Sequence, residues 1–121
     1  MLVNESFYYL RDRIIIQIHG KDKFSFIQGI ISNDVNILKK KTSIYSSILT
    51  PQGRFITDFF LTKYKDSFLI EIHENDKEVI FQKLNIYKLR SEVEFTILKN
   101  CSVLLICSNF QNLFSNLSND Q

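Results

Sequence analysis

The segment at residues 49–61, Leu-Thr-Pro-Gln-Gly-Arg-Phe-Ile-Thr-Asp-Phe-Phe-Leu, constrains the fold more than any other stretch of the chain. Pro51 presets φ for the first corner of a turn, and Gly53 suits its closing corner. On both sides of this turn, over 44–49 and 55–61, the side chains alternate with the period of two that is typical of strands. The segment therefore predicts a β-hairpin with the one proline of the chain at its tip.

Further patterns predict an alternation of strands and helices around this hairpin. Strands are expected over 14–18, 67–73, 93–97 and 102–108, and the continuous apolar core of the last is typical of a strand buried on both faces. Helices are expected from Asp22 to Ile31 and from Asn75 or Asp76 to Arg90, and a short terminal one is expected to carry an apolar stripe over 110–117.

The connections between these elements indicate the fold class. A tight turn at Lys65-Asp66 follows the hairpin, and tight turns make consecutive strands antiparallel neighbours. The helices can then cover one face of the sheet. We expect an α+β fold, a mainly antiparallel sheet with helices packed on it, related to ferredoxin-like arrangements.

Composition limits the classes of function that are open to this chain. The 121 residues predict a single domain, and a net charge of +2 is too small to argue for nucleic-acid binding. No apolar run approaches the roughly 20 residues of a membrane helix, and no secretory signal is visible. Cys101 and Cys107 have neither disulfide nor metal spacing, so we expect buried free thiols in a reducing cytosol and a cytoplasmic protein.

Asp58 is the one residue whose position asks for an explanation. Strand alternation places it on one face with Ile56 and Phe60, and a carboxylate between two large apolar side chains is costly unless a group pairs with it. It is either a strand-end carboxylate that reaches solvent, a lysine or a turn amide, or a pocket carboxylate that takes a ligand donor or a cation. On the strand at 67–73, Glu71 and His73 share a face and could interact, although a solvated strand face explains them too.

Patterns of known catalytic sites are absent from the sequence. Three glycines cannot form a Gly-rich phosphate loop, no Cys/His group has zinc spacing, and no serine lies in a Gly-x-Ser-x-Gly elbow. The residues alone therefore describe an α+β domain in which Asp58 is the candidate functional group.

Three motifs together carry a family resemblance. Ser-Asn-Asp-Val at 32–35, Leu-Thr-Pro-Gln-Gly-Arg-Phe-Ile-Thr-Asp at 49–58 and Tyr-Lys-Leu-Arg at 87–90 resemble, in order and spacing, the amino-terminal part of the YgfZ proteins. These are folate-binding relatives of the glycine-cleavage T protein. The resemblance covers roughly residues 10–97 and implies a tetrahydrofolate or a related folate as cofactor.

The resemblance also implies roles for particular residues. The aspartate matching Asp58 lies against the pterin and N10 of tetrahydrofolate, and the tyrosine matching Tyr45 lines the pocket. Such a carboxylate can accept N–H bonds from a reduced pterin, and an aromatic ring offers a stacking face. Arg90 could hold the carboxylate of a glutamate tail, although an ion pair at the helix end is an equal alternative.

Two departures from the family pattern bear on function. The T protein carries a Gly-Gly-x-x-Asp-Asp run, whereas residues 53–58 keep only the last of the two aspartates, which favours the YgfZ side. YgfZ proteins also continue well beyond this length, and neither Cys101 nor Cys107 matches their later Lys-Gly-Cys motif. The chain is thus expected to be a single domain over 1–121, the amino-terminal part of a longer folate-binding fold. Whether it is a fragment or a shortened protein stays open.

The leading expectation is a tetrahydrofolate-binding module of the YgfZ type that supports maturation of iron–sulfur enzymes, including tRNA-modifying ones. Its implied partners are a folate and iron–sulfur proteins, without direct contact to nucleic acid or membrane. The resemblance leaves open whether the chain is an enzyme by itself. One alternative is an aminomethyltransferase-like enzyme in which Asp58 positions N10; another is a shortened interaction domain that self-associates through the surface a later half would cover.

Overall fold

The computed structural model describes residues 6–107, and the predicted hairpin lies at one side of its main sheet. Strand β3 (Ser43–Leu49) pairs with β4 (Phe55–Tyr64) in antiparallel register. At the tip, the Gly53 amide donates to the Thr50 carbonyl at 2.8 Å, and the Thr50 amide donates to the Arg54 carbonyl at 2.8 Å. Gly53 has φ of +84°, a conformation that side chains with a Cβ rarely adopt.

The five-stranded sheet has the order β3-β4-β5-β2-β6, and every neighbouring pair is antiparallel. Strand β5 (Ser67–His73) returns from β4 through the turn at Lys65, whose φ is +52°. Strand β2 (Arg13–His19) lies between β5 and β6 (Glu94–Ile97). The α+β class and its antiparallel sheet are therefore confirmed, with β6 beginning one residue later than the pattern predicts.

Both α-helices pack on one face of this sheet. Helix α1 (Lys23–Ile30) contributes Phe26 and Ile27, and α2 (Lys77–Lys88) contributes Ile80 and Leu84. These side chains join one core with the inward residues of the strands, among them Ile16, Ile18, Ile48, Phe59, Leu61, Ile70 and Ile72. Two 3₁₀ turns complete the connections, η1 (Val35–Lys39) and η2 (Glu74–Asp76).

The start of α1 is held by a contact that the sequence pattern did not predict. Asp22 caps no helix amide with its side chain; its carboxylate instead accepts the Glu92 amide, at 2.8 Å, from the loop before β6. Gly20 has φ of +125°, and a Cβ there would lie 2.8 Å from the Cα of Val93. This close approach of two backbones holds the start of α1 against the loop that precedes β6.

The opposite face of the sheet carries no helix among the described residues. We call it the open face, and define it by six side chains that alternate with core residues along their strands: Arg13, Ile15, Tyr45, Asp58, Phe60 and Glu71. Each is half-buried or exposed. The layering therefore separates a helix-covered face, which holds the core, from a face with room for another molecule.

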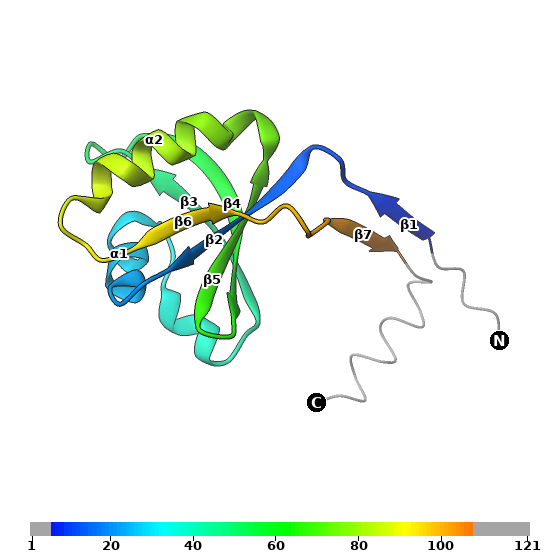
Figure 1. The fold of residues 1–121 in the computed structure, drawn as a ribbon, viewed down its shortest axis with the longest axis horizontal. Coiled ribbons are helices and arrows are strands. Elements are labelled where there is room, and N and C mark those ends of the chain that lie inside the picture. Colours follow the sequence, from blue (N-terminus) through cyan, green and yellow to red (C-terminus); the bar gives the residue numbers. More distant parts are fainter. Residues whose placement is uncertain (1–5, 108–121) are drawn as a thin grey trace.

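A two-stranded ribbon corrects the prediction of a final buried strand. Strand β1 (Ser6–Tyr9) pairs only with β7 (Leu104–Cys107), and the pair extends away from the five-stranded sheet (Figure 1). Leu104, Leu105 and Ile106 are exposed, because no other element within residues 6–107 covers the ribbon. Cys101 is exposed as well, so the expectation of a buried thiol is wrong for this residue.

The remaining elements differ from the predictions at their ends. Helix α2 ends at Lys88, so Arg90 follows the helix instead of closing it. The predicted apolar helix over 110–117 lies outside the described residues. Within residues 6–107, no helix is both long and apolar enough to cross a membrane.

Candidate functional site on the open face of the sheet

Asp58 and Tyr45 meet on the open face through a direct hydrogen bond. The Tyr45 hydroxyl donates to the Asp58 carboxylate, and Asp58 is half-buried in the middle of β4. Tyr45 lies opposite Phe60 in the β3–β4 register, with ring centroids 5.3 Å apart and ring planes at 60°. The carboxylate is therefore neither at a strand end nor paired with a lysine; a tyrosine hydroxyl satisfies it beside two aromatic rings.

This hydrogen bond changes the protonation equilibrium of the tyrosine. It raises the pKa of Tyr45 above its usual 10.0, because the phenol proton is shared with Asp58; desolvation and the carboxylate charge act in the same direction. At neutral pH the phenol is thus a fixed donor and Asp58 keeps further lone pairs free. An ionised carboxylate beside an aromatic surface can accept hydrogen bonds from the N–H groups of a flat ligand.

An arginine that the sequence analysis did not select extends this polar group. Arg13 donates from Nε to the Glu71 carboxylate and from Nη2 to the Glu71 carbonyl at 3.3 Å. The hydrogen bond to Glu71 raises the pKa of Arg13, partly offset by desolvation, and the charges of Glu71, Asp58 and Asp76 raise it further. Strand periodicity over 13–19 could have revealed Arg13, because it places the residue on the same face as Ile15.

Arg90 lies apart from this group. It follows α2, is exposed, and lines a surface hollow with Asp22, Leu89 and Ser91. Because α2 packs on the opposite face of the sheet, the structure brings Tyr45 and Asp58 together but leaves Arg90 on the helix side. Its role as a contact for a carboxylate tail stays a prediction.

A cavity of about 310 Å³ lies on the open face beside Phe60, the ring that packs against Tyr45. Phe60 and Glu71 line it together with Ile15 and Leu69, and the segment that leads into β7 lines it through Val103 and Leu104. Phe60 thus contacts both Tyr45 and the cavity. The open face therefore combines a small apolar hollow with an adjacent carboxylate and a guanidinium.

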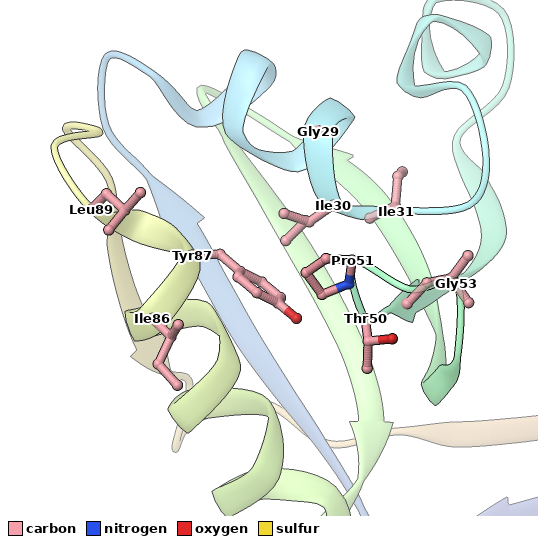
Figure 2. A pocket seen from close by; sticks show the side chains of 10 residues that line it. Gly29, Ile30, Ile31, Thr50, Pro51, Gly53, Ile86, Tyr87 and Leu89 are labelled. Atoms are coloured by element: carbon pink, nitrogen blue, oxygen red, sulfur yellow. The ribbon is translucent and has the colours of Figure 1, made fainter.

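A second and larger cavity, of about 730 Å³, lies on the helix side. Figure 2 shows it between the end of α1, the β3–β4 turn and the end of α2, with the Tyr87 ring directed towards Pro51 and Thr50. No charged residue lines it. Two of the three sequence motifs line this cavity, through Pro51 and Tyr87, and the third begins directly after Ile31, which also lines it.

Metal-binding chemistry has no candidate residues in the described part of the chain. Within residues 6–107, no group of three or more His, Cys, Asp or Glu side chains is placed to hold a metal ion.

Comparisons with known proteins show that the chain is similar to proteins named as iron–sulfur cluster assembly factors. Models of known families give no match. The mitochondrial iron–sulfur cluster assembly factor IBA57 homologues of Neurospora crassa and Pyricularia oryzae are 31% and 30% identical, over 74% of this chain and 22% and 24% of their own lengths. The homologue of Dictyostelium discoideum is 26% identical over 93% of this chain and 36% of its length. The chain thus spans about a quarter to a third of these relatives.

A solved structure shows the same fold. The glycine cleavage system aminomethyltransferase T from Bartonella henselae superposes with a TM-score of 0.74 at 18% sequence identity, over 84% of this chain and 28% of the other. The similarity covers the sheet and helices and shows the fold alone.

The relatives contradict one expectation from the sequence. They are named as mitochondrial proteins, which points to mitochondria instead of the cytoplasm. The physical reason for the error is that reduced cysteines and a missing secretory signal do not separate the cytosol from any other reducing compartment.

Proposed function

This chain belongs to the YgfZ-type family of the IBA57 homologues, as its sequence relatives show, and has the fold of the glycine-cleavage T protein; we propose that it binds a tetrahydrofolate on its open face in support of iron–sulfur cluster assembly. The assembly role comes from the named function of the relatives. The chain spans about a quarter of the Neurospora crassa and Pyricularia oryzae proteins, so the activity of the whole protein is part of the proposal. The proposed partners are iron–sulfur proteins, and the proposed outcome is the maturation of tRNA-modifying enzymes.

The Tyr45–Asp58 hydrogen bond is the observation that supports a folate as the ligand. A reduced pterin presents several N–H donors in one plane, and a carboxylate can accept two or more of them. Asp58 already accepts one proton from Tyr45, which leaves its remaining lone pairs for the ligand. Phe60 and Tyr45 supply apolar and aromatic surface next to it, and the adjoining cavity has the size of a small ring system.

The geometry favours binding over aminomethyl transfer. The position that matches the first aspartate of the T-protein Asp-Asp pair is Thr57. Its side chain is buried on the helix side, and its hydroxyl donates to the Asp76 carboxylate at 2.8 Å, so it cannot act beside Asp58 on the open face. We therefore propose a binding role and assign no catalytic residue.

Calorimetric titration with 5-formyltetrahydrofolate tests this proposal, since a chain without tryptophan gives a poor fluorescence signal. We expect saturable binding that Asp58→Asn weakens by about tenfold or more, because a charge-assisted hydrogen bond contributes about 1.5–3 kcal/mol. Tyr45→Phe removes the hydroxyl and keeps the ring, and is expected to weaken binding less.

Arg90→Gln is the matched control for this titration, because Arg90 is also polar but lies on the helix side. Unchanged affinity in Arg90→Gln would limit the site to the open face, whereas a large loss would restore Arg90 as a contact for the glutamate tail. A folded wild-type chain that takes up no folate would contradict the proposed function of this chain.

A further inference from the structure

The polar segment between α1 and η1 lies along the outer edge of β3, which is the first strand of the five-stranded sheet. The Ser32 amide donates to the Ser47 carbonyl at 2.9 Å, and the Ser47 amide donates to the Ser32 hydroxyl at 3.1 Å. Further along β3, the Asn33 side-chain amide donates to the Tyr45 carbonyl at 2.9 Å. We call Ser32 and Asn33 the edge pair. It satisfies backbone groups that an edge strand otherwise leaves unpaired.

These contacts show how β3 is oriented beside the candidate site. Tyr45 and Ser47 direct their carbonyl groups outwards, so both occupy ladder positions that exchange no backbone hydrogen bonds with β4. Side chains at such positions lie closer to the opposite strand than those of hydrogen-bonded positions. Ser47 lies opposite Asp58 in the register. Tyr45 comes two residues earlier, so its ring reaches Asp58 along the diagonal.

The edge pair is itself held by the helix layer. The Oδ1 atom of Asn33 accepts the Asp34 amide at 2.7 Å, which directs Nδ2 of the same side chain towards β3. The following Val35 is 1% exposed, and its amide donates to the side chain of Gln28, on α1, at 2.8 Å. Tyr45, by contrast, is 55% exposed. The edge pair therefore connects the exposed strand at Tyr45 to the packed side of the domain.

Strand β3 has few other restraints near the site. It pairs with β4 alone in the sheet, and their register shifts between Ile48 and Leu49. A slip of one residue in a strand turns each side chain to the other face. Among the described residues, every hydrogen bond to the outward backbone groups of Tyr45 and Ser47 comes from the edge pair.

We infer that the edge pair positions the folate site: it holds β3 in the register that lets the Tyr45 hydroxyl reach Asp58. The inference rests on the proposed function, and it assigns neither residue of the edge pair a contact with the ligand. It gives the Ser-Asn-Asp-Val motif at 32–35 a role at the open face, although the motif follows a helix on the other side of the sheet.

Asn33→Ala tests this positioning role, because it removes the donor to the Tyr45 carbonyl. We expect the pKa of Tyr45 to move down towards 10.0 as its hydroxyl withdraws from Asp58. Carbon-13 NMR of the tyrosine Cζ atoms measures this pKa in the ligand-free chain. Affinity for 5-formyltetrahydrofolate, from calorimetric titration, should fall about three- to tenfold, the range expected for the loss of one neutral hydrogen bond.

Asn36→Ala is the matched control, because the Asn36 side chain donates to Asp34 at 3.0 Å in the same turn, and among the described residues it has no hydrogen bond to β3. Ser32→Ala removes the acceptor of the Ser47 amide and should act as Asn33→Ala does. Ser32→Thr keeps the hydroxyl and should retain the wild-type pKa and affinity. Urea denaturation followed by circular dichroism establishes that each variant is folded.

A purely structural role for the edge pair predicts lower stability in Asn33→Ala and Ser32→Ala with an unchanged pKa of Tyr45, and that result would overturn the inference. A lowered pKa with wild-type affinity would overturn it too, because the position of the hydroxyl would then not matter to the ligand. The phenol titration needs no ligand. A wild-type chain that takes up no folate would therefore contradict the proposed function, while the pKa comparison would still decide whether the edge pair positions Tyr45.

Discussion

At the scale of single residues, Asp58 shows how a half-buried carboxylate is stabilised on a strand. Its neighbours on the open face, Ile56 and Phe60, are apolar and cannot donate hydrogen bonds. Tyr45 on the adjacent strand supplies the donor and keeps its ring against Phe60. One side chain thus satisfies the carboxylate and shields it, while the second carboxylate oxygen remains available to a ligand.

The Tyr45–Asp58 bond predicts a measurable titration. The pKa of Tyr45 is raised above 10.0, so its phenol should keep its proton until the pH exceeds that ordinary value. Asp58→Asn is expected to move this pKa down towards 10.0, because the negative charge that holds the proton is gone. Carbon-13 NMR of the tyrosine ring Cζ atoms follows each phenol separately.

Asp66→Asn is the control for this titration, because Asp66 is fully exposed and its carboxylate pairs with Lys23. A raised folded-state pKa stabilises the fold while the phenol is protonated. The contribution of Tyr45 should therefore be complete below pH 10 and vanish as pH rises through the raised pKa. An ordinary pKa for Tyr45 in the wild type would show that the hydrogen bond does not persist in solution.

At the scale of elements, the C-terminal end of α2 carries an unfavourable leucine. Leu89 has φ of +45° and ψ of −109°, and 86% of it is exposed to solvent. Helices commonly end with glycine at such a position, because a Cβ makes the conformation costly. The residue lines the rim of the helix-side cavity (Figure 2).

Leu89→Gly is therefore expected to stabilise the domain. Relief of the strained conformation should raise the free energy of unfolding by about 1 kcal/mol, since the exposed side chain contributes little packing. Urea denaturation followed by circular dichroism measures the change. The matched control is Ile86→Gly, an exposed apolar residue within the same helix, where glycine should lower stability by about 1 kcal/mol. A loss of stability in Leu89→Gly would mean that its side chain makes contacts the structure does not show.

The elements with clear periodicity could be predicted from the sequence. Alternation identified β3, β4 and β5, because one face of each strand packs on the core and the other does not. The continuous apolar run of β7 was misleading, because such a run indicates burial only where a second layer exists, and none of the described elements forms one over the ribbon. The end of α2 could not be placed either, since no glycine or proline marks it.

The candidate site could be predicted only in part. Asp58 stood out because a charge interrupts an apolar face, and the family resemblance added Tyr45. Strand alternation could have placed Arg13 on the face of Ile15, but its contact with Glu71 depends on β2 lying next to β5, a long-range pairing that periodicity does not reveal. The family resemblance assigned Arg90 to the same site as Asp58, although the two residues lie on opposite sides of the sheet.

At the scale of the whole molecule, the sheet divides two candidate binding regions. The open face carries the Tyr45–Asp58 pair and a small cavity, whereas the helix side carries a larger uncharged cavity that two of the sequence motifs line. Size alone would favour the helix side. Chemistry favours the open face, because only there do a carboxylate and aromatic rings lie together for a ligand with N–H donors.

The measurement that tests this assignment most directly is a map of backbone amide chemical shifts in a nitrogen-15-labelled chain during titration with 5-formyltetrahydrofolate. The account predicts shifts at Tyr45, Asp58 and Phe60 that saturate with added ligand and that Asp58→Asn abolishes. Saturating shifts confined to Gly53, Ile86 and Leu89 on the helix side would contradict it and would move the folate site to the other face of the sheet.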